Sequence, residues 1–170
     1  MLLVPGNLRP LLSRLGLSRL APGSVDFWPG SGARTVDLGR FVRAGIQICY
    51  EIIFSGQVVD RAHRPDFLFN PSNDAWFGAW GPPQHLAQAR LRAIEEGLPV
   101  VRATPTGISA IIAADGRVLH AIPFRQAGRI DADLPAATAP TPFARFGNLA
   151  PLALAALFML VAVAMPRLRR

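Results

Sequence analysis

The chain has 170 residues, of which 51% are hydrophobic and only 17% are charged, and its formal net charge is +7. This length is sufficient for one domain with a sizeable core. A single cysteine excludes an internal disulfide and any zinc site built from several cysteines. All 18 basic residues are arginines, and their scattered positions do not favour nucleic-acid binding. We expect no metal, no other cofactor and no nucleic-acid partner.

The order of strand and helix patterns predicts a layered α/β domain with a mixed sheet over residues 36–134. Residues 1–35 are rich in Pro, Gly, Ser and Arg, and they predict a short amphipathic piece and loops rather than the start of an independent domain. The predicted strands are Thr35–Leu38, Phe41–Ile48, Asp66–Asn70, a strand from Val100, a hairpin of Gly107–Ala113 and Val118–Ile122, and Arg129–Asp133. The predicted helices run from Ser55 to Ala62, and from Pro82 to a stop at Gly97.

The stretch Gly45–Glu51 carries the most suggestive chemistry. An apolar strand ends at Cys49, and Tyr50 and Glu51 follow at once. A thiol just before a helix start lies where backbone N–H groups can stabilise a thiolate, so Cys49 is a candidate nucleophile. The alternative is that Cys49 is a small buried hydrophobic residue without chemistry. Taken alone, this stretch favours that alternative.

Two later features add polar groups to the candidate site. The loop Pro71–Gly78 places small polar residues beside two large aromatic residues, although ordinary turn chemistry explains the same pattern. His85 falls in the first turn of the second predicted helix. The fourth position after it is Ala89, which cannot bind a metal, so we interpret His85 as structural or pocket-lining rather than as a metal ligand.

The carboxyl-terminal segment 149–165 contains no charged residue. As a helix it would rise roughly 25 Å, near the lower limit for crossing a bilayer core of about 30 Å. A buried core helix is the alternative. Because the segment is apolar on all sides and the arginine-rich tail 166–170 follows, we expect a transmembrane helix with a cytoplasmic tail, joined to the domain by the linker 135–148. The amino terminus shows no signal peptide.

Five motifs follow one another along the chain, and they are Ile48–Glu51, Ser72–Gly78, Gln84–His85, Ala89–Ala93 and Thr141–Asn148. Their order resembles the carbon–nitrogen hydrolase (nitrilase) superfamily, and most closely its bacterial apolipoprotein N-acyltransferase branch. The resemblance covers about residues 36–165. It implies the carboxyl-terminal part of an αββα sandwich of the nitrilase type, anchored in the bacterial inner membrane and facing the periplasm.

The resemblance also implies a reaction. A fatty acyl chain moves from a phospholipid to the thiol of Cys49 as a thioester, and then to the free amino group of a diacylglyceryl-cysteine apolipoprotein. Tyr50 and Glu51 would support Cys49, with Glu51 helping to bind or orient the substrate amine. The residues expected to bind substrate lie in the matching loop and are Asn73, Asp74 and Trp76.

The sequence departs from this family in its catalytic partners. Members use a glutamate base and a lysine that precede the cysteine, whereas this sequence contains no lysine and no glutamate before Cys49. Leu3–Pro5 resembles a run that follows the family's lysine, so we expect the chain to begin just downstream of that residue. Arginine cannot replace lysine, because it does not release its proton. We therefore expect little or no transferase activity from the chain alone.

Two other functions stay open at this point. The chain could be a different carbon–nitrogen hydrolase, acting as an amidase on a soluble substrate. It could also be a non-catalytic module anchored in a membrane, with Cys49 as part of its core.

Overall fold

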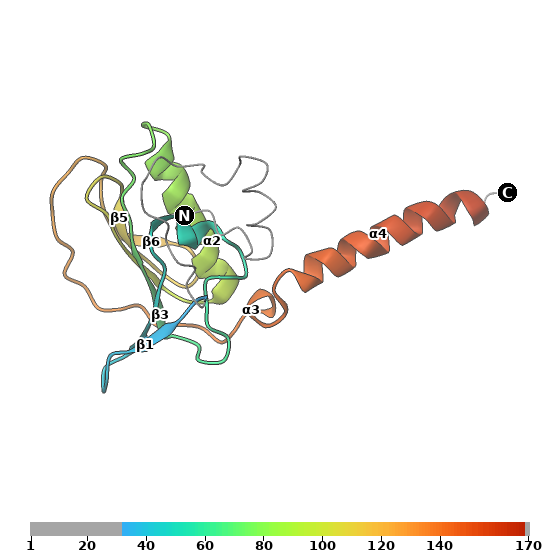
Figure 1. Cartoon of the computed structure of the whole chain (residues 1–170), viewed down its shortest axis with the longest axis horizontal. Helices are drawn as coiled ribbons and strands as arrows, with labels where there is room; N and C mark the ends of the chain where they lie inside the picture. Colours follow the sequence, from blue (N-terminus) through green and yellow to red (C-terminus); the bar gives the residue numbers. More distant parts are fainter. Residues whose placement is uncertain (1–31, 169–170) are drawn as a thin grey trace, which may run out of the picture. The chain divides into compact units, whose positions relative to one another are not determined.

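A computed structural model describes residues 32–168 of the chain. Inter-residue contacts divide the chain into two units, residues 1–32 and 33–170, and every element named below belongs to the second. Residues 1–35 are predicted to be an amphipathic piece with loops, and residues 1–31 of this segment lie outside the described residues. Within the described part, six strands form one sheet in the order β1–β2–β3–β4–β5–β6 (Figure 1).

The sheet is mixed, and its central strands are parallel. The strands are β1 (Thr35–Asp37), β2 (Arg43–Ile46), β3 (Phe67–Pro71), β4 (Val100–Ala103), β5 (Ser109–Ile112) and β6 (Val118–Ile122). Strands β2, β3 and β4 run parallel, whereas β1, β5 and β6 are antiparallel to their neighbours. The carboxyl ends of β2, β3 and β4 therefore meet at one edge of the sheet, which is where open α/β sheets bind their ligands.

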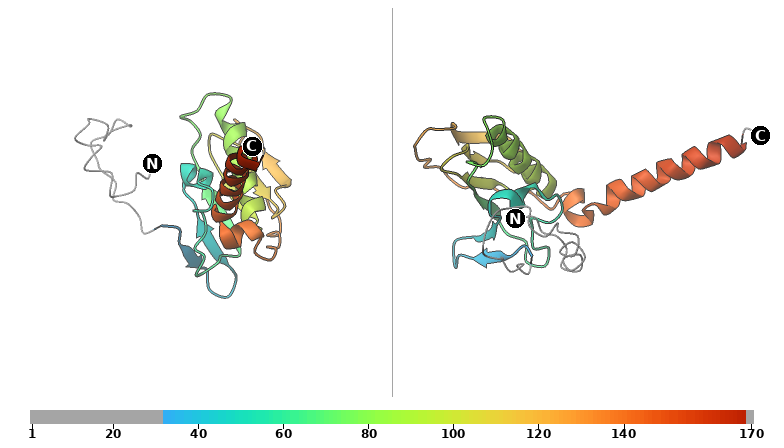
Figure 2. Two further views of the ribbon diagram at one scale, coloured as in Figure 1. Left: turned by 90° about the vertical axis from the view of Figure 1, so that its right-hand side faces the viewer. Right: turned by 45° about the horizontal axis from the view of Figure 1, so that its top comes forward.

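One long helix covers the sheet. The helical elements are the 3₁₀ helix η1 (Cys49–Ile53), α2 (Gly81–Glu96), α3 (Pro142–Phe146) and α4 (Leu149–Leu168). Helix α2 lies beside the strands in both views of Figure 2. Its small residues Ala89 and Ala93 allow close approach to the sheet. The core beneath them consists of Ile52, Val58, Leu68, Leu98, Val100, Ala110 and Ile112.

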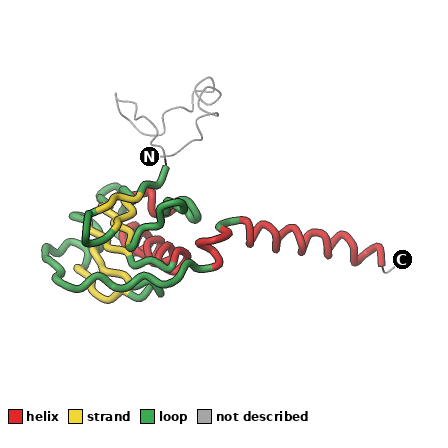
Figure 3. Tube along the Cα trace, turned by 90° about the horizontal axis from the view of Figure 1, so that it is seen from below, coloured by secondary structure: helices red, strands yellow, loops and turns green. Residues whose placement is uncertain are grey.

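The prediction of an α/β fold with a mixed sheet is confirmed. Helix α2 ends at Gly97, whose φ of 65° is the left-handed conformation that glycine adopts most easily. The hairpin is present as β5 and β6, which pair antiparallel. The described residues form one sheet with one covering helix, and Figure 3 shows the long loops that join these elements. They do not include the second sheet of the expected αββα sandwich.

The helix predicted over Ser55–Ala62 is wrong. Residues 54–63 form turns and bends, and the helical element lies earlier, in η1. The reason is a contact distant in sequence: the Ser55 hydroxyl donates to the carboxylate of Glu95 at 3.0 Å, and it therefore does not cap a helix. The Asp60 carboxylate accepts the backbone N–H groups of Ala62 and His63 and closes a local turn instead.

The strand predicted over Arg129–Asp133 is also wrong. These residues form no ladder with another described strand. Arg129 and Asp131 form an ion pair at 2.9 Å, and both side chains are exposed. The segment therefore has no buried face that would hold it against the sheet. The linker 135–148 contains the short helix α3, which begins after Thr141, whose hydroxyl accepts the N–H of Ala144.

The helix predicted over residues 149–165 is present as α4. Many of its apolar side chains are exposed, including Leu152, Phe158, Met159 and Leu160. None of the helices in the described part of the chain combines the length and the apolar character that a membrane span requires. The transmembrane assignment of this segment is therefore not confirmed and stays a prediction.

Glu96, at the end of α2, gives the fold a pH dependence. Burial raises the pKa of its carboxyl, although the nearby Arg61 opposes the shift. The folded state thus holds this proton more tightly than the unfolded chain. The contribution to stability is full below the unfolded-state pKa and is lost as pH rises through the raised folded-state pKa.

Glu96→Gln is expected to abolish this loss, which cannot exceed about 1.4 kcal/mol per pH unit for one proton. Chemical denaturation of both proteins between about pH 4 and pH 8 measures the effect. The variant should gain stability relative to the wild type as the pH rises. A difference between the two proteins that stays constant over this range would contradict the assignment.

Candidate active site

Cys49 lies just past the carboxyl end of β2, as the first residue of η1. Its side chain is partly exposed, and its φ is 51°. This left-handed conformation is disfavoured for a residue with a β-carbon, and such strained residues cluster at functional sites. The thiol donates a long hydrogen bond of 3.7 Å to the backbone carbonyl of Asn73. The residue in this strained conformation thus carries the chain's only thiol.

Asn70, on β3, fixes the backbone around Cys49. Its side chain is fully buried, and its amide donates to the carbonyls of Gln47, at 2.6 Å, and Cys49, at 3.2 Å. Its carbonyl oxygen accepts from Ser72 and Arg102. All of the hydrogen-bonding groups of this buried amide are therefore used within the protein, as buried polar groups require.

A buried ionic cluster lies next to this amide. Asp74 follows β3, Arg102 lies on β4 and His85 comes from the first turns of α2. Arg102 donates to one Asp74 carboxylate oxygen at 2.6 Å, and Nδ1 of His85 lies 2.7 Å from the other. The side chains of Asp74 and Arg102 are both fully buried. Nε2 of His85 contacts the carbonyl oxygen of Cys49 at 3.1 Å, so the cluster reaches the candidate nucleophile.

Gly107 makes room for this cluster. A β-carbon at this position would lie 2.1 Å from Oδ2 of Asp74 and 2.8 Å from its Cγ. Both distances are shorter than any real contact, so a side chain here would displace the carboxylate. The loop before β5 can thus pack closely against Asp74 because Gly107 has no side chain.

Tyr50 and Glu51, the residues predicted to support Cys49, have different surroundings. The Glu51 carboxylate accepts the backbone N–H of Ile48 at 2.8 Å, so in this structure it holds the chain on the amino side of Cys49. Tyr50 is exposed, and its ring stacks on Phe77 with centroids 6.5 Å apart. Their catalytic roles stay predictions.

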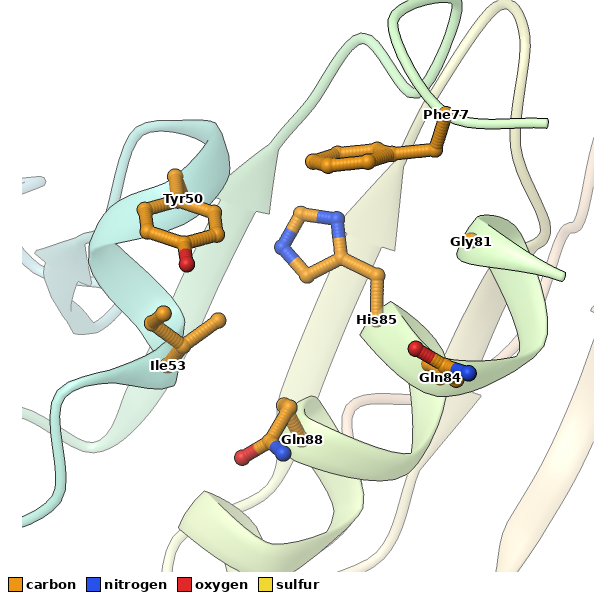
Figure 4. Close-up of a pocket in the computed structure, with 7 residues that line it drawn as sticks. All are labelled: Tyr50, Ile53, Phe77, Gly81, Gln84, His85 and Gln88. Atoms are coloured by element: carbon orange, nitrogen blue, oxygen red, sulfur yellow. The ribbon is translucent and has the colours of Figure 1, made fainter. Parts of the chain in front are cut away.

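A pocket of about 270 Å³ opens beside these residues (Figure 4). Tyr50 and Ile53 of η1 form one wall, facing the side chains of α2, and Phe77 lies over His85. The α2 residues that line the pocket are Gly81, Gln84, His85 and Gln88. The interpretation of His85 as a pocket-lining and structural residue thus agrees with its placement. The pocket joins apolar rings to the side-chain amides of Gln84 and Gln88, which suits a mixed apolar and polar ligand.

The three residues predicted to bind substrate are separated by the structure. Asp74 is buried, and both of its carboxylate oxygens are occupied. The Asn73 side chain is exposed and accepts from Thr106 at 2.7 Å. Trp76 is 85% exposed, so it is open to any partner that approaches the loop. Substrate binding by these residues stays a prediction.

Sequence reasoning missed Asn70 and Arg102. A signal for Arg102 was present, because an arginine inside the apolar strand Val100–Ala103 requires a buried partner. No comparable signal marked Asn70. No group of three or more His, Cys, Asp or Glu side chains in residues 32–168 is placed to hold a metal ion.

The family profile described as carbon-nitrogen hydrolase matches residues 6–142. The chain belongs to the carbon-nitrogen hydrolase family. Among solved structures, a CN-hydrolase superfamily protein from Xanthomonas campestris is similar, with a TM-score of 0.50, 20% identity, and coverage of 67% of this chain and 46% of that one. An amidase from Nesterenkonia sp. AN1 also gives a TM-score of 0.50, at 16% identity, over 75% of this chain and 50% of that chain. At these identities the likeness concerns the fold alone.

Curated relatives share the resemblance seen in the motifs. A protein of Bradyrhizobium diazoefficiens named apolipoprotein N-acyltransferase is 44% identical over 154 residues, covering 90% of this chain and 29% of the relative. A protein of the same name from Rhodopseudomonas palustris is 40% identical over 152 residues, covering 89% and 28%. The resemblance to this branch of enzymes is therefore confirmed. The chain spans less than a third of the length of these relatives.

Proposed function

We propose that Cys49 is the nucleophile of an N-acyltransferase that takes a fatty acyl chain from a phospholipid and transfers it to the amino-terminal diacylglyceryl-cysteine of an apolipoprotein. The observation that carries this proposal is the placement of Cys49. The thiol lies in a strained turn at the carboxyl edge of the sheet, next to residues that line an aromatic pocket. The names of the curated relatives supply the substrate class.

The reaction has two steps. In the first, Sγ of Cys49 attacks the ester carbonyl of the phospholipid. A C–S bond forms, the ester C–O bond breaks, and the released alkoxide takes the proton that the thiol gave up. In the second, the amine nitrogen attacks the thioester, a C–N bond forms, the C–S bond breaks, and the proton lost by the amine returns to sulfur. A thioester is reactive enough for this second attack, so the two steps predict ping-pong kinetics.

The lipid donor and the bacterial inner membrane are part of the same proposal, with the domain on the periplasmic side and the tail in the cytoplasm. Exposed apolar side chains of α4, such as Leu152 and Phe158, would suit a lipid environment. Trp76 and Trp80 flank the pocket residue Phe77 in sequence and are 85% and 82% exposed. Tryptophan is enriched where proteins meet the membrane–water interface.

An acylation assay with three donors tests the proposal. The chain, in detergent micelles, is incubated with a phospholipid, with the p-nitrophenyl ester of a long-chain acid, or with a small amide, and intact mass is recorded before and after hydroxylamine. The activated ester is expected to acylate Cys49, since its leaving group needs no proton. The phospholipid is expected to react slowly, because the sequence has no lysine and no glutamate before Cys49.

The other outcomes point to the two alternatives. Faster turnover of the amide than of either ester would indicate an amidase with a soluble substrate. A folded chain whose thiol resists both esters and iodoacetamide would indicate a non-catalytic module with an inert cysteine. Rapid acylation of the chain by phospholipid would support the reaction but would refute the expected impairment.

A further inference from the structure

We infer that His85 is a positioning residue, which holds the carbonyl of Cys49 and so fixes the direction in which Sγ points. The inference rests on the proposed role of Cys49 as a nucleophile. It concerns the backbone of Cys49, however, and can be tested without any acyl transfer.

The conformation of Cys49 requires external support. Its φ of 51° costs free energy for a residue with a β-carbon. Hydrogen bonds hold the chain on both sides of this residue. On the amino side, the Glu51 carboxylate accepts the N–H of Ile48 at 2.8 Å. On the carboxyl side, the Cys49 carbonyl is approached by Asn70 at 3.2 Å and by His85 at 3.1 Å.

The direction of the contact with His85 follows from the groups involved. A backbone carbonyl oxygen can only accept a hydrogen bond, so Nε2 of His85 must carry the hydrogen that it donates to Cys49. The opposite ring nitrogen, Nδ1, lies 2.7 Å from Oδ1 of Asp74 and 3.1 Å from Nη2 of Arg102, and these two buried neighbours fix the rotation of the imidazole. The ring therefore connects a buried carboxylate to the backbone of the nucleophile.

The support behind His85 is rigid. Asp74 is held by Arg102, and the Arg102 guanidinium also donates to Ser72 and to the carbonyl of Ile108. The side chains of Asp74 and Arg102 have no exposed surface, and that of His85 is 4% exposed. Gly107 allows this packing, as described above. A ring fixed in this way can hold a strained peptide, whereas a mobile side chain could not.

Two polar replacements separate the two contacts of the ring. In His85→Gln the side-chain amide can reach the position of Nε2 and donate to Cys49, but it does not restore Nδ1. In His85→Asn the amide can reach the position of Nδ1 beside Asp74, but it is too short for Cys49. His120→Gln is the matched control, because His120 lies on β6 and is exposed.

The primary measurement is the conformation of Cys49 in isotope-labelled protein, from its Cα and Cβ chemical shifts and its HN–Hα coupling. We expect His85→Gln and the control to keep the left-handed φ, and His85→Asn to lose it. The second measurement is acylation by the p-nitrophenyl ester, which should be about 10- to 100-fold slower in His85→Asn and close to normal in His85→Gln. The rate at which the small reagent iodoacetamide alkylates Cys49 should differ much less between the wild type and His85→Asn.

The inference is overturned if folded His85→Asn keeps the φ of Cys49, or if both replacements alter it equally. If a replacement does not fold, the wild-type protein still tests the inference, because long-range ¹H–¹⁵N spectra show whether Nε2 of His85 carries a hydrogen. A hydrogen there supports the inference, and its absence refutes it. If wild-type Cys49 is never acylated but its φ depends on His85, the proposed function fails and the positioning role stands.

Discussion

Replacing Cys49 with serine is expected to abolish acyl-enzyme formation. Serine has nearly the same shape, so the strained turn and the hydrogen bonds to Asn70 and His85 are retained. Its hydroxyl is a much weaker nucleophile than a thiol unless a base is placed beside it. In the structure, the group hydrogen-bonded to Sγ is the carbonyl of Asn73, which can accept a hydrogen bond but is no base. Acylation by the p-nitrophenyl ester should fall by on the order of 10³-fold or more.

The rate of p-nitrophenolate release and the mass of the intact chain measure this effect. A matched control moves the thiol instead of removing it: Ala75→Cys in the Cys49→Ser background places a cysteine in the neighbouring exposed loop. That thiol is accessible but lacks the strained turn, so it should react at the rate of an ordinary cysteine. Equal acylation of the moved and the native thiol would mean that the site contributes nothing beyond exposure. Undiminished acylation of Cys49→Ser would place the nucleophile elsewhere.

The position of Cys49 could be predicted because it depends on local patterns. An apolar run that ends in Cys49–Glu51 predicts the thiol at the end of a strand, and the structure has it as the first residue of η1, three residues after the last residue of β2. Helix α2 could be predicted equally well, since Pro82 lies in its first turn, Gly97 follows its last residue and its apolar residues repeat at helical spacing. Short-range periodicity is sufficient to predict an element where no contact distant in sequence competes with it.

The surroundings of Cys49 could not be predicted in the same way. Asp74, His85 and Arg102 come from three elements, and the last is 28 residues from the first. Their meeting depends on the parallel order of β3 and β4 and on the packing of α2, which no local pattern determines. A similar long-range contact, from Ser55 to Glu95, removed the predicted helix over 55–62. Glu51 shows the opposite case, where a carboxylate that resembles a substrate-binding group is used by a backbone N–H three residues away.

Arg102→Met is expected to cause the largest loss of stability of any replacement in the cluster. Methionine fills much of the same volume, but it leaves the Asp74 carboxylate buried without its cationic partner. It also removes the donors to Asn70 and Ser72. Removing one member of a buried ion pair typically costs about 3–5 kcal/mol, because the remaining charge is uncompensated. The variant should therefore unfold at a much lower denaturant concentration, as followed by circular dichroism in detergent.

A surface pair provides the matched control. Arg117 donates to Asp115 at 2.7 Å, nearly the same distance as in the buried pair, but its side chain is 74% exposed. Arg117→Met should leave the unfolding midpoint almost unchanged, because water compensates the charge that remains. The comparison isolates the effect of burial from the effect of the contact itself.

A double-mutant cycle with Asp74→Asn identifies the cause of the loss. If the uncompensated carboxylate is responsible, neutralising Asp74 should recover part of the stability lost in Arg102→Met, so the double variant should be more stable than the sum of the single effects predicts. Additive effects would show that Arg102 acts only through its other hydrogen bonds. An Arg102→Met chain with the wild-type midpoint would show that the cluster does not stabilise the fold at all, and the rigid support inferred for His85 would fail with it.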